Sequence, residues 1–148
     1  MPYPALKLPP IQARLEVRDG QELIFDEIRK KFLILTPEEW VRQHFLHLLI
    51  NHLNYPRGLF QVERQHTYAQ SAKRSDIVVL NKSGAPFLLV ECKACDVRIN
   101  QQTLEQIALY NKTLAAEYIA VTNGLEHFIW KKNEDGYLQL DRFPTYSA

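Results

Sequence analysis

The feature that most constrains the fold is a pair of apolar runs on either side of a short turn sequence. The runs are Ile77–Leu80 and Pro86–Val90, and Asn81–Ala85 lies between them. Runs rich in Val, Leu and Ile around a turn that contains Gly predict a β-hairpin.

Three charged residues, Asp76, Glu91 and Lys93, stand at the ends of these runs. Burying a charge near a core is costly unless the charge is paired or binds a metal, so we expect these residues to have a function. If the turn centres between Ser83 and Gly84, Asp76 lies opposite Glu91, with Cβ atoms roughly 5 Å apart on one face. Alternation along the strand brings Lys93 to the same face.

Two carboxylates at that separation repel each other unless a cation lies between them. Their oxygen atoms suit Mg²⁺ or Mn²⁺. The hairpin therefore predicts a divalent-metal site, and we propose that this site cleaves nucleic acid. The prediction depends on the register, because a slip of one residue would move Asp76 to the other face of the sheet.

Length and composition indicate an ordinary folded domain. The 148 residues are 46% hydrophobic and 24% charged, enough for one domain with a sizeable core. We expect residues 1–12, which are rich in Pro, to form an extended N-terminal arm, and residues 13–148 to form a single domain. The chain has no apolar run of transmembrane length and no signal-peptide pattern at its start, so we expect a cytoplasmic protein that does not bind membranes.

The net charge of +1 predicts weak DNA binding by this chain alone, so we expect a partner subunit or a homodimer to supply affinity. Cys92 and Cys95 have CxxC spacing, but no second Cys pair or matched His pair completes a zinc site. We interpret them as two small reduced residues.

The order of predicted elements is α-β-β-β-α-β-β after an N-terminal β-hairpin around Asp19–Gly20. This order predicts an α/β (α+β) fold in which helices flank a mixed central β-sheet. Thr36 as N-cap, Pro37 at the first helical position and Glu39 three residues after the cap mark the start of the first helix. The other expected elements are a short strand at 31–35, strands at 59–68 and 117–122, a helix at 100–114 and a closing hairpin at 128–140.

The spacing of Asp76 and Glu91-Cys92-Lys93 resembles the PD-(D/E)xK nuclease superfamily. Further segments, in the same order along residues 30–132, resemble the N-terminal nuclease domain of the R (restriction) subunit of type I restriction enzymes. They are Thr36–Gln43, Arg74–Val79, Leu89–Ala94, Gln106–Asn111 and Val121–Gly124. Ser75 stands where the superfamily motif has Pro, and no helicase motor follows Ala148, so we expect no ATP-driven translocation.

The resemblance implies a restriction-endonuclease-like fold, Mg²⁺-dependent DNA cleavage, and partners among motor or modification subunits. Asp76, Glu91 and the Cys92 carbonyl would ligate the metal, and Lys93 would orient or deprotonate the attacking water. Glu39 would reach the site from the first helix. DNA-binding or site-supporting roles are implied for Gln106 and Tyr110, which match a QxxxY motif, and we add Arg74 to this group.

Structural alternatives remain open for each of these residues. Glu39 also suits a capping box, Gln106 a helix surface, and Tyr110 a core. Asp76 also suits a strand-end cap and Lys93 a solvated strand end. A second hypothesis for the whole chain is a DNA- or protein-binding module of the same fold with weak catalysis or none.

Overall fold

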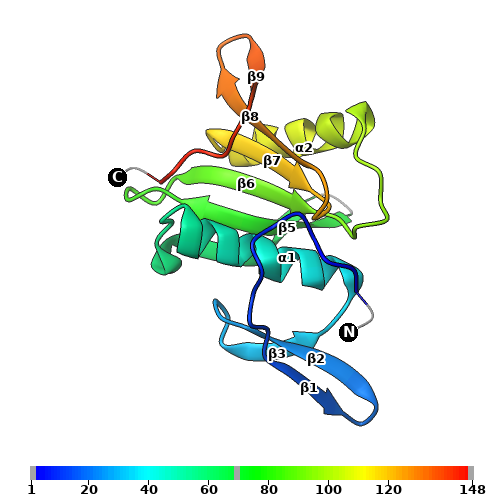
Figure 1. The fold of residues 1–148 in the computed structure, drawn as a ribbon. Helices are drawn as coiled ribbons and strands as arrows, with labels where there is room; N and C mark the ends of the chain where they lie inside the picture. Colours follow the sequence, from blue (N-terminus) through cyan, green and yellow to red (C-terminus); the bar gives the residue numbers. More distant parts are fainter. Residues whose placement is uncertain (1–2, 69–70, 147–148) are drawn as a thin grey trace.

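Two β-sheets organise the chain (Figure 1). The computed structural model describes residues 3–68 and 71–146, and for 63–68 and 71–76 it describes the backbone alone. Within these residues, the small sheet is β1 (Leu15–Arg18), β2 (Gln21–Asp26) and β3 (Lys31–Ile34). The large sheet, in spatial order, is β4 (Phe60–Tyr68), β5 (Ser71–Leu80), β6 (Pro86–Cys92), β7 (Tyr118–Thr122), β8 (His127–Asn133) and β9 (Gly136–Leu140).

The large sheet is mixed, as the sequence predicts. β6 and β7 are parallel, and the other neighbouring strands pair antiparallel. A parallel pair needs a crossover connection, and helix α2 (Gln101–Leu114) supplies it. The hairpin predicted at the centre of the sequence is therefore β5–β6, and its turn is closed by a hydrogen bond from Asn81 N–H to the Ala85 carbonyl (2.8 Å).

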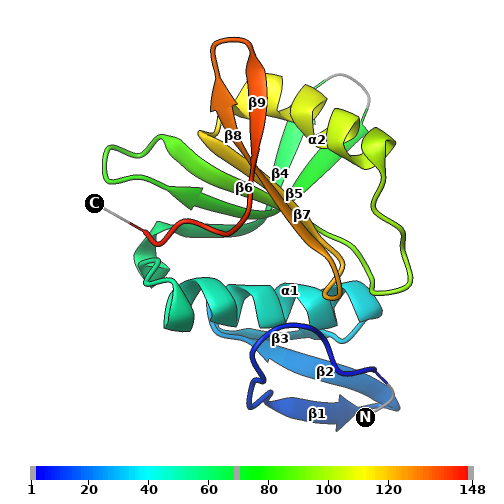
Figure 2. The ribbon, with the colours of Figure 1, turned by 45° about the horizontal axis from the view of Figure 1, so that its top comes forward.

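Helix α1 (Pro37–His47) lies between the two sheets (Figure 2). Its predicted start is confirmed, because Thr36 Oγ1 accepts a hydrogen bond from Glu39 N–H at 3.0 Å. In the sequence, an apolar stripe of Val41, Phe45, Leu48, Leu49 and Leu53 predicts a helix that continues until 55–58. The α-helix ends earlier, at His47, and continues as a π-helical turn, Leu48–His52. The wider turn carries the chain to Leu53, whose N–H donates to the Leu48 carbonyl and whose side chain packs on the core.

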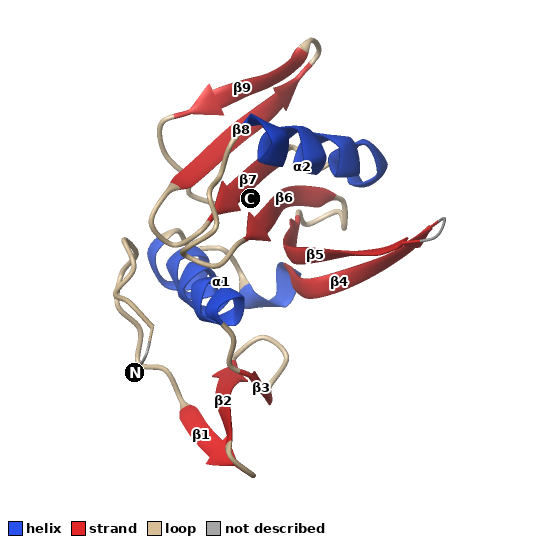
Figure 3. Cartoon of the chain, turned by 90° about the vertical axis from the view of Figure 1, so that its right-hand side faces the viewer, coloured by secondary structure: helices blue, strands red, loops and turns tan. Residues whose placement is uncertain are grey.

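The two faces of the large sheet carry separate hydrophobic clusters. Strand side chains packed with α1 form what we call the α1 cluster: Ile77, Val79, Leu88, Val90, Cys92, Ala120 and Ile129. The α2 cluster on the opposite face includes Val78, Leu89, Ile119, Val121 and Trp130, which pack with Ile107, Tyr110 and Leu114 of α2. Figure 3 shows α2 on one side of the sheet and α1 on the other. In residues 3–68 and 71–146, neither these helices nor the short turn Arg57–Leu59 is long and apolar enough to cross a bilayer.

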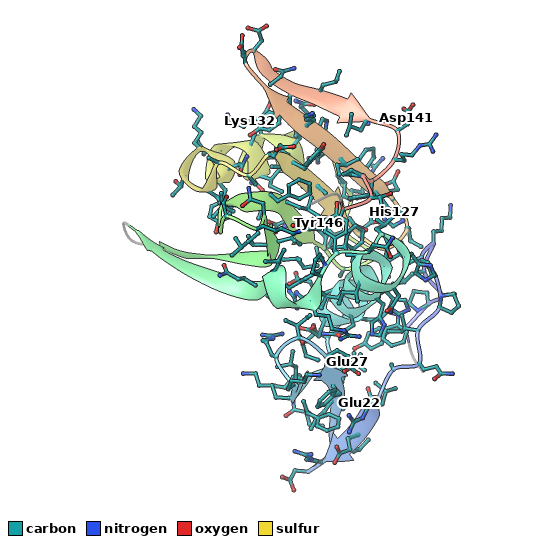
Figure 4. The ribbon with its side chains drawn as sticks, turned by 90° about the vertical axis from the view of Figure 1, so that its left-hand side faces the viewer. Glu22, Glu27, His127, Lys132, Asp141 and Tyr146 are labelled. Atoms are coloured by element: carbon teal, nitrogen blue, oxygen red, sulfur yellow. The ribbon has the colours of Figure 1, made fainter. Side chains whose placement is uncertain are left out.

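The N-terminal arm packs on the domain. The Tyr3 ring stacks on Trp40 of α1 with centroids 5.8 Å apart. Lys7 N–H donates to the Gly124 carbonyl (2.8 Å), and His127 Nε2 lies 2.9 Å from the Lys7 carbonyl oxygen. In Figure 4, His127 is labelled on the side of the molecule where the N-terminal arm runs, and Glu22 and Glu27 are labelled in the region of the small sheet below α1. The arm thus joins α1 to the turn between β7 and β8.

Gly124 is the residue at which the arm, α1 and this turn meet, so we expect Gly124→Ala to be destabilising. Its φ is +87°, and a Cβ would lie 2.8 Å from Leu6 Cδ2 and 3.2 Å from Val41 Cγ2. A left-handed backbone costs a non-Gly residue about 1–2 kcal/mol, so thermal unfolding should shift down by several degrees. Gly58→Ala is the matched control, because open space surrounds Gly58. Equal melting temperatures for the two variants would contradict this account.

Candidate active site

Glu91 and Lys93 lie together at the end of β6. The side chains of Val90 and Cys92 belong to the α1 cluster, so the alternation of the strand turns Glu91 to the α2 face. Lys93 Nζ is 3.3 Å from Glu91 Oε2, and the two side chains are 29% and 20% exposed. The predicted convergence of these two residues is therefore confirmed, in a position that solvent reaches.

The turn after β7 holds the end of β6 in place. Lys93 N–H donates to the Thr122 carbonyl (2.8 Å), which continues the parallel ladder one residue beyond the strand. Thr122 Oγ1 accepts a hydrogen bond from Gly124 N–H (3.0 Å). The Asn123 side chain donates to the Val97 carbonyl (2.9 Å) in the loop that follows Lys93. The Thr122-Asn123-Gly124 segment therefore supports the backbone that carries Glu91 and Lys93.

The β5–β6 pairs next to Asp76 and Glu91 have the register that the sequence predicts. Ile77 pairs with Val90 and Val78 with Leu89, as predicted from a turn centred between Ser83 and Gly84. A bulge between Val79 and Leu80 shifts the register only toward the turn. Asp76 and Arg74 belong to β5, but their side chains lie outside the described residues, so their place in the site stays a prediction.

Glu39 is buried on the side of α1 that faces away from the large sheet. At 100° per residue it lies opposite Val41, which packs in the α1 cluster. Its carboxylate pairs with Arg42, accepts a hydrogen bond from Gln43 Nε2 (2.9 Å), and lies 4.0 Å from Arg29 Nη2. These described contacts join Glu39 to the small sheet, and its predicted role in the site stays a prediction.

Asp26, at the end of β2, is a buried acid that sequence reasoning missed. It is fully buried, and Oδ1 accepts hydrogen bonds from Ile28 N–H and Arg29 N–H, each at 2.8 Å. Oδ2 accepts from the Arg29 guanidinium (3.0 Å) and from Gln43 Nε2 (3.1 Å), so Gln43 bridges Asp26 and Glu39. The sequence signal of such a turn is the Asp itself at the end of a strand, because its short side chain can accept hydrogen bonds from the backbone N–H groups two and three residues later.

The pKa of Asp26 follows from these contacts. Burial acts to raise the pKa, but the hydrogen bonds and positive charge of Arg29, with the Gln43 amide, outweigh burial and lower it from the ordinary value of 3.8. Asp26 therefore stays ionised in the folded protein at neutral pH. This polar network of Asp26, Arg29, Glu39, Arg42 and Gln43 stabilises the contact between the small sheet and α1.

Gln106 and Tyr110 occupy different environments although they are one turn apart on α2. Gln106 is exposed, whereas Tyr110 is 4% exposed and packs in the α2 cluster. The two cysteines are free thiols, with Cys92 buried and Cys95 half-buried. Among the side chains that the structure describes, which do not include Asp76, no three His, Cys, Asp or Glu residues group as metal ligands.

Comparison with known proteins identifies a family that this chain matches. Residues 37–144 match the family described as type I restriction enzyme R protein N terminus (HSDR_N). The fold is similar to the fragment structure of a putative HsdR subunit of a type I restriction enzyme from Vibrio vulnificus YJ016, with a TM-score of 0.56 and 19% sequence identity. That match covers 75% of this chain and 24% of the other, so the chain corresponds to about a quarter of its relative. No protein with a curated description matches the sequence.

We expect Asp26→Asn to lower the free energy of unfolding by about 2 kcal/mol at pH 7, because it removes the charge from a buried, hydrogen-bonded pair. Since the folded pKa is lowered, this contribution is present above about pH 4 and is lost as the pH falls through the lowered pKa. Urea unfolding of both proteins between pH 7 and pH 2 measures the difference. Glu16→Gln, which removes an exposed ion pair with Arg18, is the control and should change little. A difference that does not vary with pH would contradict the assignment.

Proposed function

Because the chain belongs to the family of type I restriction enzyme R protein N termini, we propose that it is a Mg²⁺-dependent deoxyribonuclease domain that hydrolyses phosphodiester bonds. The observation that carries the proposal is the pairing of Glu91 with Lys93 at the end of β6. A carboxylate and an ammonium group on the rim of a buried strand provide a metal ligand and a cation in reach of one phosphate.

The donor atoms available at this end of the sheet fit a hard divalent cation. Glu91 offers carboxylate oxygens and Cys92 a backbone carbonyl, and oxygen ligands of this kind suit Mg²⁺ and Mn²⁺. If β5 and β6 keep their register for one residue beyond Ile77–Val90, Asp76 stands opposite Glu91 and completes the ligand set. When bound, such an ion lowers the pKa of water and withdraws charge from the phosphoryl oxygens.

Lys93 supplies what a carboxylate cannot. Its ammonium group would donate a hydrogen bond to the attacking water and offset the negative charge that develops on the phosphate. The support for this role is its position 3.3 Å from Glu91, which places a donor beside the proposed metal ligand. The hydrogen bond from Lys93 N–H to the Thr122 carbonyl holds the backbone that carries this side chain.

Secondary roles are proposed for residues around the pair. Gln106 is exposed on α2, on the side of the large sheet that also carries Glu91, and we propose that it contacts DNA together with Arg74. Tyr110, buried beneath it, would support the helix. The proposed partners are DNA and the motor and modification subunits of a type I restriction system, and cleavage of both strands with one site per chain would use two copies.

A binding module with weak catalysis or none is the second candidate. The net charge of +1 favours a module that docks with other subunits, because a domain that binds DNA tightly by itself would carry an excess of basic residues. The paired Glu91 and Lys93 favour the nuclease, since a binding surface has no need of a carboxylate that repels phosphate.

Cleavage of supercoiled plasmid by the purified chain is the direct test. With Mg²⁺ or Mn²⁺ we expect nicking that EDTA abolishes, and Lys93→Ala or Asp76→Ala should lower the rate by roughly 100-fold or more. Lys82→Ala is the matched control, because Lys82 is exposed in the turn at the opposite end of the β5–β6 hairpin. Nicking that persists at the wild-type rate in the Asp76→Ala, Lys93→Ala double variant would contradict the proposal.

Metal binding can be measured without cleavage. We expect Mn²⁺ to raise the melting temperature of the wild-type chain, because a ligand that binds only the folded state stabilises it. Glu91→Gln keeps the size of the side chain but removes its charge, and it should abolish the rise. Glu105→Gln, an exposed position on α2, should retain it. An equal rise in all three proteins would show that the ion binds elsewhere.

A further inference from the structure

A cavity of about 250 Å³ lies between the start of α2 and the β8–β9 pair. Two aromatic side chains, Phe128 and Trp130, and two aliphatic ones, Ile99 and Leu104, form its apolar lining. The other lining residues, Asn100, Gln101 and Gln139, carry side-chain amides. The cavity is thus an aromatic and amide pocket without a charged group in its lining.

The aromatic walls suit a flat ligand. The rings of Phe128 and Trp130 are nearly parallel, with centroids 6.1 Å apart and an angle of 18° between their planes. Trp130 is held firmly, because it is only 7% exposed, and Phe128 is half-buried. An apolar cavity of about 150 Å³ is enough for benzene, so this one has room for a single planar heterocycle.

The amides suit the edge of a nucleobase. In the part of the chain that the structure describes, the carboxamides of Gln101 and Gln139 have no hydrogen-bond partner. Asn100 uses Oδ1 to cap α2 through Thr103 N–H, which leaves its amide nitrogen as a donor. A carboxamide presents a donor and an acceptor side by side, and these match the donors and acceptors on base edges.

The cavity lies beside the Glu91–Lys93 pair on the same face of the large sheet. Glu91 pairs in register with Val121 of β7, and Val121 pairs with Phe128 of β8. Neighbouring strands are about 4.8 Å apart, so the backbones of Glu91 and Phe128 are separated by roughly 10 Å. That is the reach of one or two nucleotides along a single strand.

We propose that this cavity binds one unpaired base of the DNA strand whose backbone passes Glu91 and Lys93. The base stacks on the Phe128 and Trp130 side chains, and the Gln101 and Gln139 amides contact its edge. A DNA base is favoured over a free small molecule because the cavity adjoins Glu91 and Lys93, the pair that we propose acts on a DNA phosphate. In this respect the inference rests on the proposed function.

Fluorescence of Trp130 gives a direct readout. The chain has two tryptophans, so Trp40→Phe leaves Trp130 as the single reporter. In EDTA, where no cleavage occurs, we expect a short oligothymidylate to quench this fluorescence saturably. An abasic oligonucleotide of the same length and charge should bind roughly tenfold more weakly, because it lacks the stacked base. Thymidine monophosphate should be a poor competitor, since it lacks the flanking phosphates.

Variants test the lining. Phe128→Leu keeps an apolar side chain but removes the aromatic face, and it should weaken quenching by oligothymidylate roughly tenfold. Gln102→Ala is the matched control, because Gln102 is an exposed neighbour of Gln101 outside the cavity. Because Trp40 packs on Tyr3 and His44, a 2-aminopurine oligonucleotide titrated into the wild-type chain provides a second measurement that needs no change at Trp40.

The outcomes separate this inference from the nuclease proposal. Saturable quenching that requires the base and Phe128 supports the cavity even if plasmid cleavage is absent. Equal quenching by the abasic oligonucleotide, or no saturable quenching by oligothymidylate in both measurements, overturns it even if metal-dependent cleavage is present. Thymidine monophosphate that binds as tightly as the oligonucleotide overturns the assignment to a DNA strand.

Discussion

Strand β6 is buried on both faces, and the position of the candidate site depends on how its side chains alternate. Leu88, Val90 and Cys92 pack against α1, whereas Leu89 packs against α2. A slip of one residue would exchange the two sets, and each buried apolar side chain contributes about 1.5–3 kcal/mol. Core packing therefore fixes the register of β6. Glu91 lies on the α2 face as a consequence, even though partial burial of its carboxylate costs free energy.

Helix α1 is held by two kinds of interaction. Its apolar side packs on the large sheet, and its opposite side joins the small sheet through Glu39, Gln43 and Asp26. Removing the charge of Asp26 takes a counterpart from the Arg29 guanidinium, which costs about 2 kcal/mol. The beginning of α1 is thus tied firmly in place close to the Gly124 turn, which in turn supports the backbone at Lys93.

Local signals in the sequence predicted most of the fold. Thr36, Pro37 and Glu39 marked the start of α1 correctly, and the apolar runs around Asn81–Ala85 predicted both the β5–β6 hairpin and its register. The end of α1 was not predictable from the apolar stripe. The π-helical turn keeps the apolar side chains in contact with the core, so the sequence pattern is the same as for a continued α-helix.

The candidate site was predictable only in part. Glu91 and Lys93 are two residues apart on one strand, so alternation alone brings them together. The contacts of Glu39 with Gln43 and Asp26 depend on how the small sheet docks against α1, and no local pattern encodes that docking. The cavity beside α2 likewise combines residues from α2, β8 and β9, whose spacing in the sequence carries no motif.

The low net charge of the chain indicates which of the two proposed subsites, the Glu91–Lys93 pair or the cavity beside α2, would contribute more to DNA binding. Glu91 and Lys93 nearly cancel each other, and a net charge of +1 gives little long-range attraction for phosphate. Base stacking tolerates any sequence and, unlike contacts with phosphate, releases no counterions. A neutral cavity one or two nucleotides from the carboxylate would therefore hold a strand in place where the metal ligand alone would repel it. In this proposed arrangement the uncharged cavity would bind the base, and Glu91 and Lys93 would act on the phosphodiester bond.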